Sequence, residues 1–257
     1  MTDQSQNPAD NNDVNEGQPL VEHLIELRSR VLKSLVSIVI IFLPLFYFAN
    51  EIYTFVAEPL QRFLPEGTTM IATEVASPFL APFKLTLVLS VFLAMPYILH
   101  QLWSFISPGL YANERRVTLP LLFSSIVLFY TGIAFAFFVV FPLVFGFFTS
   151  VAPAGVSVMT DINRYLDFVL KLFFAFGLAF EIPIATVLLV WTGATDVASL
   201  KKKRPFIILG CFGVGMLLTP PDVISQILLA VPMWLLYEVG LLFAATLGKR
   251  PTDEAQQ

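Results

Sequence analysis

The chain has 257 residues, of which 56% are hydrophobic and only 13% are charged, and its formal net charge at pH 7 is −4. Soluble domains carry about 25% charged residues, so this composition excludes an ordinary soluble protein and indicates an integral membrane protein. A single cysteine, Cys211, excludes an internal disulfide, and the two histidines form no cluster with it that predicts a metal site. The apolar runs have helical length, which favours a helix bundle over a β-barrel.

The first 18 residues are polar and acidic, and they lack the basic and apolar regions of a secretory signal. We expect residues 1–18 to form a disordered cytoplasmic tail, residues 19–248 a single membrane domain, and residues 249–257 a second short tail. From Leu20 to Lys33, apolar residues recur at steps of three and four, which predicts an amphipathic helix. We expect this helix to rest on the membrane surface and to lead into the first span.

Six apolar segments follow, and each is a candidate transmembrane helix. They cover residues 34–49, 79–99, 117–141, 165–191, 205–218 and 223–247. The fifth has only fourteen residues, or about 21 Å of helix, which is short of the ~30 Å hydrocarbon core. Prolines inside five of the spans predict kinked helices and a cupped surface. The predicted fold class is therefore an all-α, six-helix membrane bundle that is curved, with a short hairpin of the fifth and sixth helices.

The basic residues are distributed unevenly between the two sides of the membrane. Eleven of the fifteen fall on the side of the termini, namely Arg28, Arg30, Lys33, Arg115, Arg116, Lys201, Lys202, Lys203, Arg204, Lys249 and Arg250. The excess of Lys and Arg in cytoplasmic segments of membrane proteins then predicts that both termini are cytoplasmic. No internal repeat is visible, which weighs against a transporter built from inverted repeats.

Glu181 is the only charged residue among the twenty from Leu172 to Trp191. An ionisable group at that depth in a bilayer costs several kcal/mol, with values from about 3 to above 10, so it normally faces protein or water. We therefore expect Glu181 to meet a polar partner or water inside the membrane.

Two acidic residues, Glu26 and Glu114, are predicted at the cytoplasmic membrane surface on neighbouring segments. Each has a simple structural interpretation, because Glu26 stands four residues before Arg30 and Glu114 follows a possible helix cap at Asn113. Taken together, two exposed carboxylates suit a ligand that carries two adjacent guanidinium groups, since arginine binds carboxylate in a bidentate manner.

A third polar group lies at the turn between the fifth and sixth spans. Thr219 and Asp222 fit a solvated turn, with Asp222 as a cap of the last span. Gln226 lies one turn inside an apolar helix and needs a hydrogen-bonding partner there. One hypothesis is that Gln226 and Glu181 lie at similar depth and share a polar cluster.

Four motifs resemble the TatC family, the multispanning component of the twin-arginine protein translocase. They are HLIELRSR at 23–30, FISPGLYANERR at 105–116, FGLAFEIP at 176–183, and KKKRPF with MLLTPPD within 201–222. The motifs occur in the family's order, and the resemblance extends from about Leu20 to Leu247. It implies six helices in a cupped bundle with both ends in the cytoplasm of a bacterial inner membrane.

The resemblance also implies roles for particular residues and partners. Glu26 and Glu114 match the acids that bind the paired arginines of signal peptides on folded cargo proteins, and Arg28 supports that site. The other matched positions are Pro59 and Asp222 in the outer loops, Glu181 on the concave side, and Met216, Thr219 and Gln226 where partners dock. The implied partners are the single-span subunits TatA and TatB, and further copies of the chain, with export driven by the proton motive force. Neither a cofactor nor a catalytic residue is implied.

Three other functions are compatible with part of the pattern. A proton-coupled secondary transporter would use Glu181, although the missing repeat does not fit it. An intramembrane enzyme would use Glu181 as acid or base, but no second catalytic group is predicted at its depth. A scaffold without ligand specificity would show no preference for paired arginines.

Overall fold

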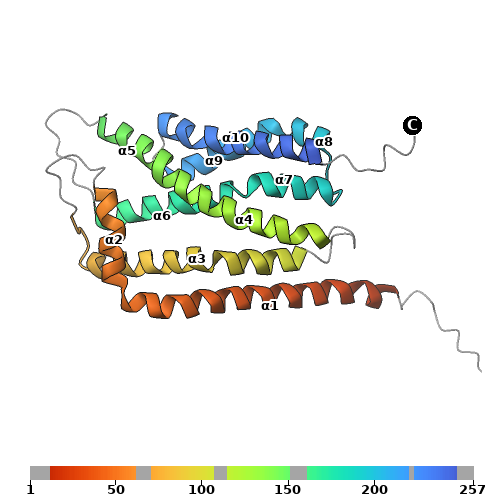
Figure 1. The fold of residues 1–257 in the computed structure, drawn as a ribbon, viewed down its shortest axis with the longest axis horizontal. Helices are drawn as coiled ribbons and strands as arrows, with labels where there is room; N and C mark the ends of the chain where they lie inside the picture. The colour runs from red at the N-terminus through yellow and green to blue at the C-terminus, as the bar shows by residue number, and fades with distance from the viewer. Residues whose placement is uncertain (1–11, 62–70, 107–114, 151–160, 220–222, 248–257) are drawn as a thin grey trace, which may run out of the picture.

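The computed structural model describes residues 12–61, 71–106, 115–150, 161–219 and 223–247, and within these ranges the protein is a bundle of helices (Figure 1). The elements are α1 (Asn12–Tyr47), α2 (Ala49–Gln61), α3 (Ser77–Ile106), α4 (Arg115–Phe135), the π-helical turn η3 (Ala136–Val140), α5 (Phe141–Ser150), α6 (Ile162–Ala179), α7 (Ile182–Trp191), α8 (Val197–Lys202), α9 (Arg204–Leu218) and α10 (Val223–Leu247). We call the end of the bundle where α1 begins and α10 ends the terminal end, and the opposite end the distal end.

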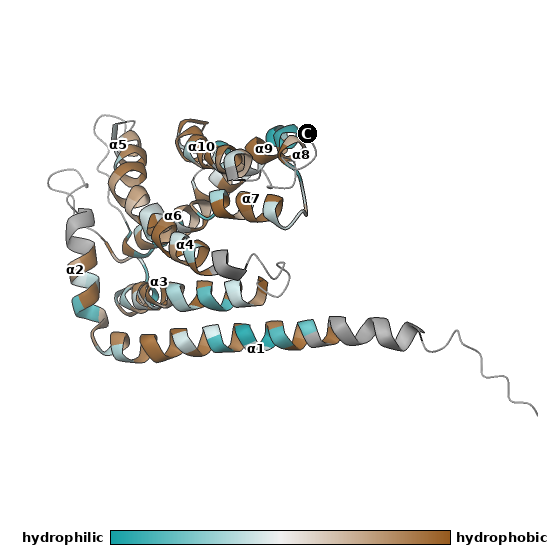
Figure 2. Cartoon of the chain, turned by 45° about the vertical axis from the view of Figure 1, so that its right-hand side comes forward, coloured by the Kyte–Doolittle hydropathy of each residue, from teal (hydrophilic) through white to brown (hydrophobic). Residues whose placement is uncertain are grey.

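Five described segments are long and apolar enough to cross a membrane, and α9 is a shorter apolar helix of 15 residues. The five are His23–Tyr47, Ser77–Ile106, Leu119–Phe148, Ile162–Trp191 and Val223–Thr246. Each of the six predicted spans coincides with one of these segments or with α9, so the all-α fold class is confirmed. Figure 2 shows hydrophobic residues over most of α5, α7 and α10, as helices embedded in lipid require.

The first helix differs from its prediction. A surface helix from Leu20 to Lys33 was expected to lead into a span at 34–49, and α1 is one uninterrupted helix of 36 residues, about 54 Å long, that begins earlier and ends at Tyr47 (Figure 1). The chain contains no glycine or proline between Val21 and Leu43, so nothing in the sequence ends the helix before the span. The helix also begins at Asn12, inside the segment that was expected to be a disordered tail.

Glycines allow the helices to approach one another closely. A Cβ atom on Gly132 would stand 2.5 Å from the carbonyl oxygen of Phe176, where α4 crosses α6. A Cβ atom on Gly240 would clash with Oγ1 of Thr186, where α10 crosses α7. Small residues at crossings are the usual means of packing helices in lipid, because burial of apolar surface gives no driving force there. These two crossings hold α6 and α7 in place, and Glu181 lies between these two helices.

A polar clasp joins two loop segments at the distal end. Asp161 caps α6 by accepting hydrogen bonds from the backbone N–H groups of Asn163 and Arg164, both at 3.0 Å. Its other carboxylate oxygen accepts from the N–H group and the hydroxyl of Thr73. The Thr73 hydroxyl first, and then the backbone N–H groups, lower the pKa of Asp161 to about 2. The amide of Asn163 also donates to the Ser77 hydroxyl at 2.6 Å.

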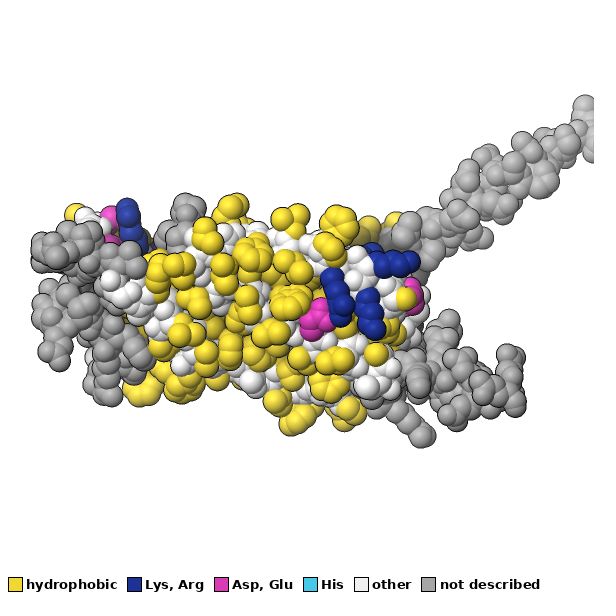
Figure 3. Space-filling view, turned by 90° about the horizontal axis from the view of Figure 1, so that it is seen from above, with side chains coloured by type: hydrophobic (Ala, Val, Ile, Leu, Met, Phe, Trp, Pro, Cys, Tyr) yellow, Lys and Arg dark blue, Asp and Glu magenta, His cyan; other side chains and the backbone are white. Residues whose placement is uncertain are grey.

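The outer surface of the bundle is largely apolar. Figure 3 shows one face covered by hydrophobic side chains, with basic side chains gathered toward one end. Among the described residues, Lys84 in α3 and Asp167 in α6 form an ion pair of 3.1 Å near the distal end. Arg28, Arg30 and Lys33 lie near the middle of α1, at the level of the end of α3, which is at the terminal end of the bundle.

Candidate functional site

Glu26 lies on the face of α1 that is turned toward α3. Its Oε1 atom accepts hydrogen bonds from Nη2 of Arg30 at 2.9 Å and from Nε at 3.2 Å, so the expected pair of residues four apart is present. Arg30 also donates to Oε1 of Gln101 at 3.2 Å and to the carbonyl of Ser104 at 3.4 Å, both in α3. The Glu26 side chain keeps 37% of its surface exposed. The carboxylate is therefore held in place by one guanidinium and is still open to another.

Two further features surround this carboxylate at the terminal end. The ring of His23 stacks on Phe105, with ring centroids 4.2 Å apart, and so ties the start of the α1 span to the end of α3. Arg28 is exposed and lines a groove on α1 that Glu26 does not line. Sequence reasoning did not single out the His23 stack, because a contact between residues 82 positions apart leaves no local pattern.

The predicted partner of Glu26, Glu114, lies outside the described residues, and so does Asp222. Pro59 is in α2 at the distal end, but its side chain is outside the described part of the structure. The expected pairing of Glu26 with Glu114 therefore stays a prediction.

Glu181 lies at a break between α6 and α7. Proline at position 183 has no backbone N–H to donate to Ala179, and α6 ends at that residue. The hydroxyl of Ser125 in α4 lies beside the Glu181 carboxyl, and it accepts a hydrogen bond from the indole N–H of Trp103 in α3 at 3.1 Å. Oε1 of Glu181 is buried and has no hydrogen-bond partner among the described residues. Groups of neighbouring helices thus surround this carboxyl, and its buried oxygen lacks a hydrogen-bond partner in the described part of the structure.

Gln226 and Glu181 do not form the shared cluster that was hypothesised. Nε2 of Gln226 donates to the carbonyl of Phe212 in α9 at 2.8 Å. The contact of Gly240 with Pro183 sets the register of α10 against α7, and the two helices run in the same direction (Figure 1). Gln226 precedes Gly240 by fourteen residues and Glu181 precedes Pro183 by two, so their depths differ by about 18 Å at 1.5 Å per residue. The hydrogen-bonding need of Gln226 is met inside the α9–α10 hairpin.

The other two residues of the predicted docking group are placed differently from each other. The hydroxyl of Thr219 is buried and donates to the carbonyl of Gly215 at 3.0 Å, so it closes the end of α9. Met216, in contrast, is 57% exposed on the outside of α9. Only Met216 of these two is free to touch a partner.

A second intramembrane carboxylate, Glu238, was missed by sequence reasoning. It is the only charged residue of α10, which is the same signal that drew attention to Glu181. The carboxylate is bound by Arg204 at the start of α9, and the neighbouring Tyr237 hydroxyl donates to the carbonyl of Leu200 at 2.9 Å. This arrangement anchors the last helix to the α8–α9 segment.

This fold defines an all-helical, multi-pass membrane protein, with acidic groups at one end of the bundle and within a span. A family model described as "Sec-independent protein translocase protein (TatC)" matches residues 22–232. The TatC protein of Azotobacter chroococcum mcd 1 is 64% identical over 243 residues, which are 95% of each chain. That of Escherichia coli K12 is 58% identical over 231 residues, 90% of each chain. The chain belongs to the TatC family.

A solved structure supports the same assignment. The structure titled "Crystal Structure of Twin Arginine Translocase Receptor- TatC" superposes with a TM-score of 0.80 and 36% identity, covering 89% of this chain and all of that one. The resemblance found in the motifs is therefore confirmed over nearly the whole chain. The protein is a multi-pass membrane component of a protein translocase.

Proposed function

We propose that the protein is the signal-recognition subunit of a twin-arginine translocase. In this proposal it binds twin-arginine signal peptides of folded cargo proteins at the cytoplasmic face of a bacterial inner membrane. It then recruits the single-span partners TatA and TatB for export driven by the proton motive force. The terminal end of the bundle is the cytoplasmic end, because the basic residues of α1 and of the α8–α9 segment gather there. The protein acts as a receptor and assembly platform and not as an enzyme.

The proposal rests mainly on the partners and the exposure of the Glu26 carboxylate. Its carboxylate already binds a guanidinium, that of Arg30, while more than a third of the side chain stays exposed. Arg30 is itself anchored to α3, so it restrains the carboxylate and leaves room for the arginine of a ligand. Glu114 supplies the second carboxylate for the second arginine. Charge-assisted guanidinium–carboxylate bonds favour arginine over lysine at such a site, because lysine cannot bind in a bidentate manner.

The intramembrane part of the proposal concerns Glu181 and the exposed side of α9. The unpaired oxygen of Glu181 accepts a hydrogen bond from a polar group of the signal peptide or of a partner helix. Met216 forms the contact surface for the partners, and Thr219 and Gln226 support it by holding the hairpin together.

A peptide-binding experiment tests the recognition site. A labelled twin-arginine signal peptide and its twin-lysine version are titrated onto the purified full-length protein in lipid nanodiscs. We expect Glu26→Ala and Glu114→Ala each to weaken binding of the arginine peptide by about 10-fold to 100-fold, the value of a hydrogen bond to a charged group. Glu51→Ala is the control, because Glu51 is an exposed acid of α2 at the distal end. Unchanged binding in both Glu26→Ala and Glu114→Ala would refute the carboxylate–guanidinium account.

A crosslinking experiment tests the docking surface separately. A photoreactive residue replaces Met216 in one variant and Leu209 in the other, since both side chains are exposed on α9. We expect crosslinks to single-span partners from position 216 and far fewer from position 209, which lies about 10 Å nearer the terminal end. Equal yields from the two positions would remove Met216 from the proposed docking surface.

A further inference from the structure

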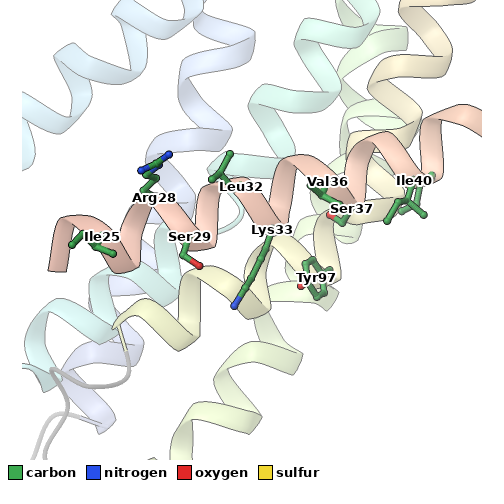
Figure 4. A pocket seen from close by; sticks show the side chains of 10 residues that line it. Ile25, Arg28, Ser29, Leu32, Lys33, Val36, Ser37, Ile40 and Tyr97 are labelled. Carbon is green, nitrogen blue, oxygen red and sulfur yellow. The ribbon is translucent and has the colours of Figure 1, made fainter. Parts of the chain in front are cut away.

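A groove runs along the side of α1 next to α3, apart from the Glu26 site (Figure 4). Its volume is about 720 Å³, within the range of about 300–1,000 Å³ that small-molecule sites occupy. The stretch of the groove from Lys33 to Ile41 is polar at its Lys33 end, and the rest of this stretch is lined mainly by branched apolar side chains; Ile25, Arg28 and Ser29 extend the groove beyond Lys33. This division along one helix matches the shape of an amphiphilic ligand.

The polar end is formed by Ser29, Lys33 and Tyr97, and Arg28 also lines the groove but points to the other side of α1 (Figure 4). Figure 4 shows Ser29 and Lys33 pointing to the side of α1 on which Tyr97 of α3 lies. Lys33 forms no ion pair with any residue in the described part of the chain. The nearest described acid on its own helix, Glu26, is bound by Arg30 on the side turned toward Gln101. The groove therefore offers an uncompensated ammonium group with two hydroxyl groups beside it.

The level of this polar end is fixed by the contact of α1 with α3. Arg30 binds Gln101, and because the two helices run in opposite directions, Lys33 lies level with Tyr97. Tyrosine and lysine at the end of a span are the residues that anchor at the headgroup level of a bilayer. From Lys33 to Ile41 the groove continues for eight residues, or about 12 Å, close to the ~15 Å half-thickness of a hydrocarbon core.

The apolar part of the groove is lined by exposed, branched side chains. Leu32, Val36 and Ile40 are 48%, 54% and 64% exposed. A transmembrane helix would pack closely only against small residues, and a lysine in the middle of the contact would oppose it. A flexible acyl chain fits between branched side chains, and it needs neither small residues nor the absence of a lysine.

We infer that this groove binds one anionic glycerophospholipid of the leaflet at the terminal end. The phosphate group lies against the Lys33 ammonium and accepts hydrogen bonds from the hydroxyl groups of Ser29 and Tyr97. One acyl chain follows Val36 and Ile40 toward the centre of the bilayer. Charge complementarity selects the anionic lipid, since basic pockets beside transmembrane helices bind anionic headgroups.

The test measures lipid binding to the full-length protein in detergent by native mass spectrometry. Phosphatidylglycerol and phosphatidylcholine with identical acyl chains are titrated, and we expect the first to bind several-fold more tightly. Lys33→Gln should weaken phosphatidylglycerol binding about fivefold, the effect of one lysine near an anionic surface. Tyr97→Phe should weaken it about threefold, the value of one neutral hydrogen bond. Lys202→Gln removes an exposed charge from the last turn of α8 and should leave this affinity unchanged.

A second pair of variants tests the acyl-chain part of the groove. Val36→Trp fills the groove, and Leu43→Trp places the same bulk on an exposed position of α1 outside the lining. We expect only Val36→Trp to abolish the preference for phosphatidylglycerol. Equal binding of the two lipids, equal effects of Lys33→Gln and Lys202→Gln, or full retention in Val36→Trp would each overturn the inference. Signal-peptide binding is not the readout, so failure here is distinct from failure of the proposed recognition function.

Discussion

Glu181 and Glu238 are both carboxylates within apolar helices, yet they are surrounded differently. Glu238 is bound by the guanidinium of Arg204, so its charge is compensated within the chain. Glu181 has only the Ser125 hydroxyl as a described partner, and no basic side chain among the described residues pairs with it. Each carboxylate keeps one buried oxygen without a hydrogen-bond partner among the described residues, so the difference lies in the counter-charge. A buried charge that is paired internally has a structural role, whereas one without a counter-charge points to a partner outside the chain.

The two carboxylates also differ in what they join. Glu238 ties α10 to the start of α9 near the terminal end, where Tyr237 reinforces the same contact through Leu200. Glu181 stands where α6 and α7 meet, in contact with α4, at the centre of the bundle. Removing a compensating group should therefore cost more stability at Glu238 than at Glu181.

The largest effect on stability is expected from Arg204→Leu, which removes the counter-charge of Glu238. Removal of one partner from a buried ion pair costs 3–5 kcal/mol, and a surface pair is worth about 0–1 kcal/mol. With exposed fractions of 42% for Arg204 and 22% for Glu238, we expect a loss of about 2 kcal/mol. Denaturant unfolding in detergent micelles measures this loss, with Lys202→Leu as the control.

The double variant sharpens the same comparison. Arg204→Leu combined with Glu238→Leu removes both charges, and it should be more stable than Arg204→Leu alone. A double variant as unstable as the sum of the single variants would show that the pair does not act as a unit. The contrast with Glu181 would then lose its basis.

The next effect concerns Ser125, which lies beside Glu181. Ser125→Ala leaves the buried indole N–H of Trp103 without an acceptor and removes the hydroxyl beside Glu181, which should cost about 1–2 kcal/mol. Ser124→Ala is a matched control, because Ser124 is adjacent and bonds only to the carbonyl of Pro120 among the described residues. Thermal unfolding distinguishes the two variants, and equal shifts would contradict this role of Ser125.

Most of the fold was predictable because its determinants are local. The span from 223 to 247 was placed to the residue, since Pro220 and Pro221 fix its start and the apolar run fixes its length. The first helix was not, because hydrophobic periodicity changes between Leu20 and Lys33 while nothing in the sequence breaks the helix. A change of polarity along a helix predicts a change of surroundings and not a change of direction.

The candidate sites were predictable only in part. A lone charged residue in an apolar run is visible in the local sequence. Glu181 was found by this signal, and Glu238 was missed although it shows the same signal. What the charge contacts is not local, because Ser125 and Arg204 reach Glu181 and Glu238 from other helices. The depth of Gln226 relative to Glu181 likewise depends on the α7–α10 register at Gly240, which no sequence period encodes.

A smaller effect is expected from combining changes at Glu181 and Gln226. The two side chains have separate partners and differ in depth by about 18 Å, so Glu181→Ala and Gln226→Leu should be additive within about 0.5 kcal/mol. A double-mutant cycle on unfolding free energy measures the coupling. Coupling above 1 kcal/mol would restore the shared polar cluster that the helix register argues against.

The smallest effect is a pH dependence at the distal end, where Asp161 lies outside the membrane spans. Its pKa in the folded protein is about 2, below its ordinary value of 3.8, chiefly because the Thr73 hydroxyl donates to the charged form. A lowered pKa contributes stability that is present above pH 3.8 and is lost as the pH falls through 2. Thr73→Val removes the largest cause, so it should raise the pKa of Asp161 and shift the acid loss of stability to higher pH. Thermal unfolding between pH 2 and pH 5 measures the shift, and Thr54→Val, at an exposed hydroxyl that bonds within α2, is the matched control. An identical pH profile in Thr73→Val and the unaltered protein would show that the clasp does not hold this carboxylate in its charged form.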